Sequence, residues 1–207
     1  MRKFRILAIV GVLALILAGC GDDGSSTVVA QTYSVQSADG DIGLTPGGTY
    51  TITQASSTGN LLFGIDAGGT EFRAFLDFPL NGSNGGGAVP LGASIVSADI
   101  EVYVNNVSLA STVPTLVDLV PFPVTGLTPA DYNSLPILTR TPFNLYPSDI
   151  NTFVRIDVTS LMVEAQNQQF RNLQLRFLLD FVPGAAGLVE LDDGAIATAP
   201  LLTVQYR

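Results

Sequence analysis

Two short acidic segments are the parts of this sequence whose side chains are best suited to hold a metal ion. Asp39 and Asp41 stand two positions apart in the run Asp-Gly-Asp-Ile-Gly, which resembles the start of a calcium-binding loop. Asp192 and Asp193 fall in a predicted turn before the last predicted strand. Calcium prefers carboxylate and carbonyl oxygens as ligands. We favour the interpretation that both segments are polar turns, and structural calcium at one of them is the alternative.

Carboxylates also provide one catalytic route, the hydrolysis of a glycosidic bond by two acids about 5–9 Å apart. The chain has 18 acidic residues, so a suitable pair is expected by chance. No other catalytic feature accompanies it, and a carboxylate glycosidase is therefore the weakest alternative. The alternative to a catalytic role is that the acidic side chains point outward from predicted strands into solvent, as we expect for Glu71, Asp77, Asp99, Glu101 and Asp180.

Four aromatic residues are candidate ligand contacts, because sugar rings stack on flat, exposed aromatic faces. Phe75 and Tyr103 fall on the polar sides of their predicted strands, and Tyr132 and Tyr146 fall in a long predicted loop. For Phe75 and Tyr103 we favour the alternative, in which both belong to a second buried layer beneath that loop.

The residue types that most enzymes depend on are missing. The chain has no His and a single Cys, which excludes Ser-His-Asp and Cys-His nucleophile systems and the usual ligands of zinc, copper, haem and iron–sulfur clusters. Its one Lys is residue 3, so the body of the chain cannot form a Schiff base. We therefore predict that the protein is not an enzyme and that calcium is the only cofactor to consider.

The charge distribution excludes a further class of partner. Three of the nine basic residues precede Cys20, which leaves six basic residues against 18 acidic ones and a net charge of −12. A body with this charge has no basic surface to neutralise phosphates, so we expect no nucleic-acid binding. Any attachment to an anionic membrane must also come from something other than charge.

The first residues have the pattern of an export signal. A basic start precedes an apolar run of 14 residues, 6–19, which is shorter than the roughly 20 residues that a spanning helix needs. The run ends in Leu17-Ala18-Gly19-Cys20, which resembles the lipobox of bacterial lipoproteins. That resemblance implies cleavage before Cys20 and a lipid on its sulfur; an ordinary signal peptide or an uncleaved anchor is the alternative.

The leader also predicts the organisation and location of the chain. We expect a signal peptide over residues 1–19, a flexible tether over 20–30 that starts at lipidated Cys20, and a single domain over 31–207. The lipid would hold this domain at the bacterial cell envelope. An Asp directly after the lipidated Cys would favour retention in the inner membrane of enteric bacteria, and Gly at position 21 therefore leaves sorting to the outer membrane open.

Beyond the tether the dominant hydrophobic period is two residues, which predicts half-buried β-strands. The clearest alternation covers residues 71–80, 95–104 and 172–181, and Gly- and Pro-rich segments separate the strands. We therefore predict an all-β protein, an antiparallel two-sheet jelly-roll sandwich. Shorter predicted strands cover 49–54, 61–65, 115–120, 152–158, 188–191 and 202–206.

Two segments depart from this pattern. Residues 159–166 have apolar side chains at helical spacing after hydroxyl caps, which predicts one short helix over an end of the sandwich. Residues 121–148 are rich in Pro, Thr and Asn and predict a long excursion, with a helical turn at 128–133. A functional loop and an ordered insertion that covers a sheet edge are equally good interpretations of this excursion.

Several segments together resemble the DNRLRE domain family, jelly-roll β-sandwich modules of exported and cell-surface proteins. The matching segments are 72–78, 91–103, 155–161, 175–177 and 192–193 ahead of 200–204. The resemblance implies a non-catalytic module, in some members polysaccharide-binding. We therefore expect a lipid-anchored structural or interaction module of the cell envelope, whose partner is an envelope protein or, as the alternative, an extracellular polysaccharide.

Overall fold

The computed structural model describes residues 26–54, 59–140, 142–180 and 186–207. The predicted signal peptide, Cys20 and the first part of the tether lie outside the described residues. Within the described part, the chain is mostly antiparallel β-strand, which confirms the predicted all-β sandwich. None of the helices described there has both the length and the apolar character needed to span a membrane.

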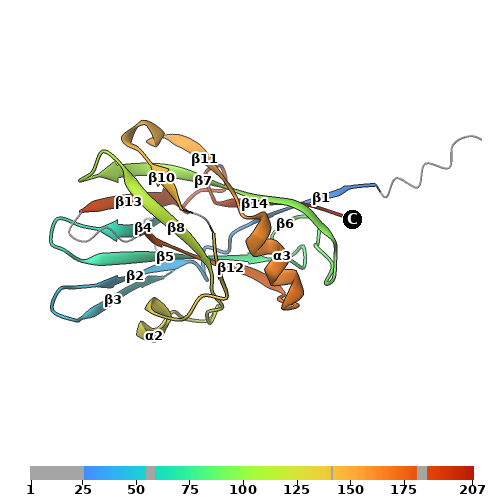
Figure 1. Cartoon of the computed structure of the whole chain (residues 1–207), viewed down its shortest axis with the longest axis horizontal. Coiled ribbons are helices and arrows are strands. Elements are labelled where there is room, and N and C mark those ends of the chain that lie inside the picture. Colours follow the sequence, from blue (N-terminus) through green and yellow to red (C-terminus); the bar gives the residue numbers. More distant parts are fainter. Residues whose placement is uncertain (1–25, 55–58, 141, 181–185) are drawn as a thin grey trace, which may run out of the picture.

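The strands form two facing layers that belong to one continuous sheet (Figure 1). One layer contains β2 (Gly40–Leu44), β3 (Tyr50–Gln54), β5 (Glu71–Pro79), β12 (Asn172–Leu179) and β8 (Val113–Leu119). The other contains β1 (Val28–Tyr33), β7 (Ile95–Ser108), β11 (Thr152–Asp157), β13 (Gly187–Asp192) and β14 (Leu201–Tyr206). Strand β4 (Asn60–Ile65) pairs with β5 in the first layer and with β13 in the second. The two predicted sheets are therefore hydrogen-bonded to each other through β4.

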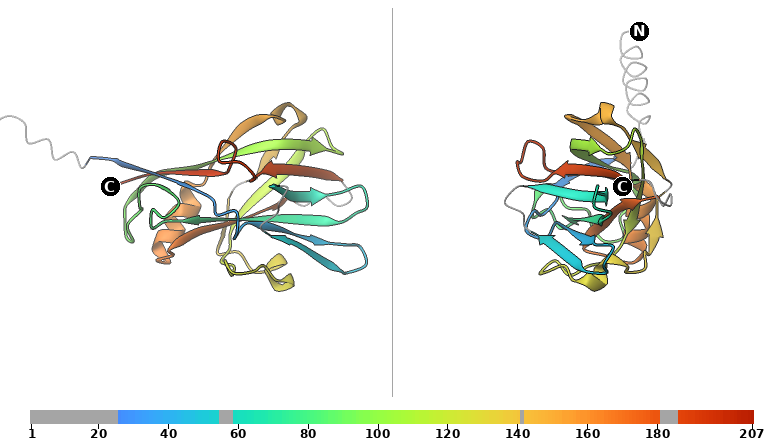
Figure 2. Two further views of the ribbon diagram at one scale, coloured as in Figure 1. Left: turned by 180° about the vertical axis from the view of Figure 1, so that it is seen from behind. Right: turned by 90° about the vertical axis from the view of Figure 1, so that its left-hand side faces the viewer.

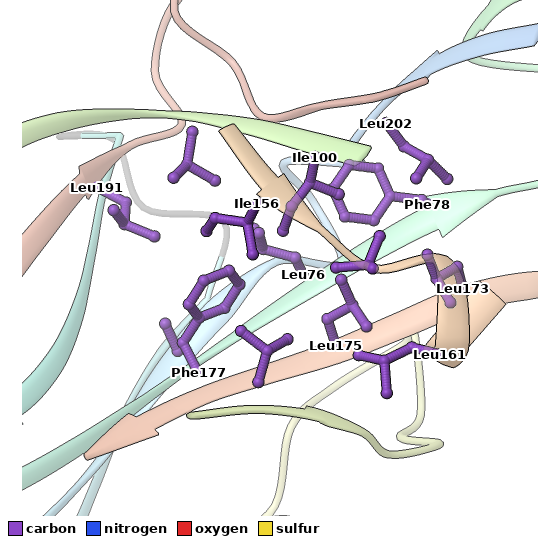
Figure 3. Close-up of a cluster of buried hydrophobic side chains, with 14 of the residues drawn as sticks. Leu76, Phe78, Ile100, Ile156, Leu161, Leu173, Leu175, Phe177, Leu191 and Leu202 are labelled. Carbon is purple, nitrogen blue, oxygen red and sulfur yellow. The ribbon is translucent and has the colours of Figure 1, made fainter. Parts of the chain in front are cut away.

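Apolar side chains from both layers fill the space between them (Figure 3). Leu76 and Phe78 of β5 and Leu175 of β12 face Ile100 of β7 and Leu202 of β14, and all five are at most 3% exposed. The end-on view of Figure 2 shows the strands arranged around this common interior. The predicted alternation is confirmed along β7, which buries every second side chain from Ala98 to Val104. In β5 every residue from Ala74 to Pro79 is buried, and β12 buries Arg176 between Leu175 and Phe177.

The predicted helix is α3 (Thr159–Asn167), which packs Leu161, Met162 and Ala165 into the core. It lies across one end of the sandwich, beside β7 and β12 (Figure 1). The predicted helical turn is α2 (Pro129–Tyr132), and it begins with a capping box between Thr128 and Asp131.

The excursion over 121–148 is ordered along its described part and covers a sheet edge. It contains two short strands, β9 (Leu138–Thr139) and β10 (Phe143–Leu145), which both pair with β8. A short 3₁₀ helix, η1 (Pro147–Asp149), follows. These pairings support the second interpretation of the excursion, because they satisfy backbone groups that β8 would otherwise leave open.

The excursion also covers a face that the sequence predicted to be solvated. Beneath it lies a second apolar cluster, in which Phe75 of β5 packs edge-on against Phe122 with ring centroids 5.4 Å apart. Asp77, predicted to be a solvated outward residue, is 2% exposed. It tolerates burial because the amide of Asn172 donates to both of its carboxylate oxygens at 2.9 Å.

Besides β9 and β10, three described strands were not expected from the sequence. Strand β1 begins at Val28, so the last three residues of the predicted tether belong to the sandwich. Strand β2 occupies residues that were expected to start a calcium loop, and it pairs with both β3 and β5. A two-residue strand, β6 (Gly85–Gly86), pairs with the end of β1 and completes the sheet order.

Candidate functional site

A pocket of about 600 Å³ opens where the end of β1 meets two loops. One loop precedes β6 and contributes Ser83 and Asn84, and the other joins β13 to β14 and contributes Asp193 and Ile196. Two further pockets, beside Phe170 and beside Leu91, measure about 300 and 290 Å³. The pocket at the end of β1 is therefore large enough for a ligand of several rings, and it is the candidate functional site.

Hydrogen bonds to backbone carbonyls hold the walls of this pocket in place. The side-chain amide of Asn84 donates to the carbonyls of Tyr33 and Ser34 at 3.0 and 2.7 Å, and Tyr33 N–H donates to the backbone carbonyl of Asn84 at 2.9 Å. Ser34 N–H donates to the carbonyl of Pro200 at 2.9 Å. The pocket is thus largely pre-formed, which lowers the entropy cost of binding a ligand.

The loop that carries Asp193 is fixed by its own polar groups. Asp192 accepts a hydrogen bond from Gly194 N–H at 2.7 Å, and Asp193 N–H donates to the carbonyl of Gly59. A side chain on Gly59 would meet the backbone of Gly194 at 2.2 Å. Glycine at position 59 therefore lets the chain before β4 approach the turn closely enough to position Asp193.

Asp39 and Asp193 lie together at the inner side of the pocket. Their carboxyl groups are in hydrogen-bonding contact, and the Ser34 hydroxyl donates to Asp193 Oδ1 at 3.2 Å. Burial raises the pKa of Asp39 well above its ordinary value, and the neighbouring charge of Asp193 raises it further. Burial raises the pKa of Asp193 to about 6. The sequence placed these two residues in separate candidate clusters, and the fold joins them.

The other two calcium candidates are placed differently. Asp41 lies in β2, where it accepts a hydrogen bond from Leu62 N–H at 3.2 Å, and burial raises its pKa to about 6. Asp192 is half-buried and caps the turn at Gly194. Within the described ranges, no group of three or more His, Cys, Asp or Glu side chains is placed to hold a metal ion.

The four predicted aromatic contacts lie outside the pocket. Phe75 is fully buried beneath the excursion, and Tyr132 of the excursion is buried in the same cluster, where the Arg73 guanidinium lies 4.0 Å from the centre of its ring. Tyr103 is half-buried on the outer face of β7, not under the excursion, and packs edge-on against Phe153 of β11 at 5.1 Å. Tyr146 is 42% exposed, next to η1.

Tyr33 is the aromatic residue that does line the pocket, and the sequence analysis missed it. It ends β1, in which Ala30 and Thr32 are buried. The alternation of that strand was detectable, but it follows directly on the small polar residues of the tether, which concealed its start.

No family model matches this chain, and no curated protein matches it either. The function therefore has to be inferred from the chemistry of the site and from the sequence.

Proposed function

We propose that this protein is a non-catalytic, lipid-anchored module of the bacterial cell envelope that binds a polysaccharide segment in the pocket at the end of β1. The observation that carries the proposal is the lining of that pocket. It combines the aromatic ring of Tyr33 with the hydroxyls of Ser34 and Ser83, the polar side chain of Asn84 and the carboxylate of Asp193. Rings that carry many hydroxyl groups need this combination of flat surface and hydrogen-bonding groups.

Charge narrows the class of ligand. Asp193 is the only charged side chain in the pocket lining, and no Arg or Lys is among the lining residues. A phosphate, a sulfate or an acidic sugar would meet a carboxylate with no basic side chain among the lining residues to balance it. The pocket therefore favours a neutral saccharide, whose adjacent hydroxyls donate to the carboxylate.

The same lining argues against hydrolysis. A glycosidase needs two carboxyl groups on either side of the scissile bond. The pocket offers Asp193 alone, because Asp39 stands behind it and is 1% exposed. A binding role without a reaction centre is therefore better supported than a carboxylate glycosidase.

The proposed tether limits how far the module reaches from the membrane. Eight Cα–Cα steps separate Cys20 from Val28, where β1 begins. A fully extended chain spans about 3.5 Å per residue, so the sandwich would lie within about 28 Å of the lipid. This reach suits a module that holds envelope polysaccharide close to the membrane surface.

A glycan array probed with the full chain in detergent tests the proposal, followed by calorimetry on the best neutral oligosaccharide. We expect Tyr33→Ala to weaken binding about tenfold, the loss of roughly 1.4 kcal/mol of ring contact. The matched control is Tyr146→Ala, which removes an exposed tyrosine elsewhere and should leave the affinity unchanged. A blank array, or binding that depends on Tyr146 and not on Tyr33, would contradict the proposal.

A further inference from the structure

One buried carboxylate oxygen has no partner. Asp39 is 1% exposed, and its Oδ1 accepts a hydrogen bond from Asp77 N–H at 2.6 Å. Its Oδ2 is buried and has no hydrogen-bond partner among the described residues, although the Ser34 hydroxyl and the Asp193 carboxyl group lie beside the Asp39 carboxyl group. An ionised oxygen in this state is costly, because it has lost water and gained no donor.

The neighbour of this oxygen increases the cost. The Asp39 carboxyl group contacts that of Asp193, and two like charges at this distance repel strongly away from water. The three ion pairs among the described residues all use other carboxylates, Glu71, Asp99 and Asp118. No basic side chain of the described chain therefore balances Asp39 and Asp193.

Other buried carboxylates of the same layer have hydrogen-bond donors, unlike Asp39 Oδ2. Asp77 has both oxygens satisfied by Asn172, and Asp41 has hydrogen bonds from Leu62 and from the Thr53 side chain. Both sit in an equally buried part of the sandwich without an unpartnered atom. The shortage of donors is confined to Asp39, at its contact with Asp193.

We propose that Asp39 and Asp193 bind a calcium ion at the inner side of the pocket. The donor set is made entirely of oxygen, which suits a hard cation, and calcium accepts irregular coordination that backbone carbonyls and water complete. Magnesium is less suited, because it requires near-octahedral geometry and holds its water tightly. Asp193 lines the open pocket, so the ion and its water ligands reach the site from solvent.

Such an ion would connect distant parts of the chain. Asp39 directly precedes β2, near the start of the sandwich, and Asp193 directly follows β13, near its end. The chain has a single cysteine, so an intramolecular disulfide cannot make this connection. Calcium would therefore stabilise the closure of the sandwich and fix the loop that carries one wall of the pocket.

A proton shared between the two carboxyl groups is the competing occupant. It would satisfy the same oxygen and remove the same repulsion without any metal. Calcium binding with a defined stoichiometry at neutral pH distinguishes the ion from the shared proton. This measurement does not depend on whether the pocket binds a saccharide.

The test uses the full chain in detergent at about pH 7.5, treated with a chelator and then titrated with calcium chloride in a calorimeter. We expect one saturable site, a rise in the thermal unfolding midpoint that grows with calcium concentration, and at least tenfold weaker binding of magnesium. Asp39→Asn and Asp193→Asn should each weaken calcium binding at least tenfold. Asp180→Asn, which changes an acid outside the pocket, should leave calcium binding unchanged.

Two results would overturn the inference. The first is the absence of saturable binding and of any change in the unfolding midpoint up to about 10 mM calcium, beyond the weakest range of calcium modules. That result would leave the shared proton as the occupant. The second is calcium binding that both Asn variants retain at full strength. If one Asn variant does not fold, the wild-type titration and the other variant still decide the question.

Discussion

Arg176 and Asp118 form a buried ion pair that fastens the excursion to the sheet. Arg176 Nη2 and Nε lie 2.6 and 3.2 Å from Asp118 Oδ2, and the two side chains are 3% and 4% exposed. Arg176 Nη1 donates to the carbonyls of Tyr132 and Ser134, both at 2.9 Å. One guanidinium therefore joins β8, β12 and the residues that end α2.

Replacing Arg176 should be among the most damaging single changes in the sandwich. Arg176→Met leaves the Asp118 carboxylate buried without its partner, and we expect the free energy of unfolding to fall by about 3–5 kcal/mol. Urea unfolding of the two proteins measures this change. The control is Arg155→Met, which breaks a pair with Asp99 in which Arg155 is 60% exposed and should leave the free energy of unfolding close to that of the wild type. Equal losses in the two variants would contradict this assignment.

Phe75 should affect stability and leave ligand binding alone. Its ring is fully buried against Phe122, so Phe75→Ala should lower the free energy of unfolding by about 3–5 kcal/mol. Saccharide affinity of the folded fraction should stay within twofold of wild type, because Phe75 lies outside the pocket lining. An unchanged urea midpoint, or a selective loss of saccharide binding, would show that the ring is a ligand contact after all.

Asp157 should stabilise the start of α3 in a pH-dependent way. Its Oδ1 accepts a hydrogen bond from Thr159 N–H at 2.8 Å, and hydrogen bonds from the Thr159 side chain and backbone lower the pKa of Asp157. Because the pKa is lowered in the folded chain, the stabilisation is present at pH values above about 4, the ordinary pKa of an Asp side chain, and it is lost as the pH falls below that value. Because Asp157 is exposed and screened by solvent, we expect Asp157→Ala to cost only about 0.5 kcal/mol at pH 7.

Urea unfolding at neutral pH and at about pH 2.5 checks the prediction for Asp157. The difference between wild type and variant should shrink at the acidic pH, because protonation of the Asp157 carboxyl group removes the charge that the Thr159 hydrogen bonds stabilise. A difference of equal size at both values would mean that Asp157 acts through packing rather than through its charge.

The proposed anchor predicts a modified cysteine. Mass spectrometry of the N-terminal peptide of the mature protein should find a chain that begins at Cys20 and carries a thioether-linked diacylglycerol, with a further acyl group at its amino terminus in hosts that add one. Cys20→Ser should move the protein from the detergent phase to the aqueous phase. A free sulfhydryl on a product that stays in the medium would refute the anchor.

Much of the fold follows from the sequence because its strands are half-buried. β5, β7 and β12 alternate clearly in sequence, and Gly and Pro separate them from their neighbours. β7 exposes part of its polar side, whereas the second apolar cluster also buries Phe75 on the outer side of β5. β2 was missed because all of its residues except Leu44 are buried, which leaves no polar alternation to detect. A strand covered on both faces looks like a polar turn when two of its five residues are glycine and one is aspartate.

The site was harder to predict, because its parts are distant in sequence. Ser34 and Asp193 form a hydrogen bond across 159 positions, and no local pattern indicates that contact. The sequence identified Asp39 and Asp193 by residue type and could not bring them together. Phe75 was favoured as a buried residue beneath the loop, and the fold bears this out, whereas the fold alone reveals that Tyr132 turns inward from the excursion into the same cluster.

The most direct measurement of the central claim is a map of the ligand on the protein. The full chain, labelled for NMR, is titrated with the best neutral oligosaccharide from the array, and backbone amide shifts are followed. We predict saturable shifts confined to residues 33–37, 83–85 and 193–199, the segments that line the pocket. Shifts centred on Tyr103 and Phe153, or no saturable shifts with any neutral glycan, would contradict the account.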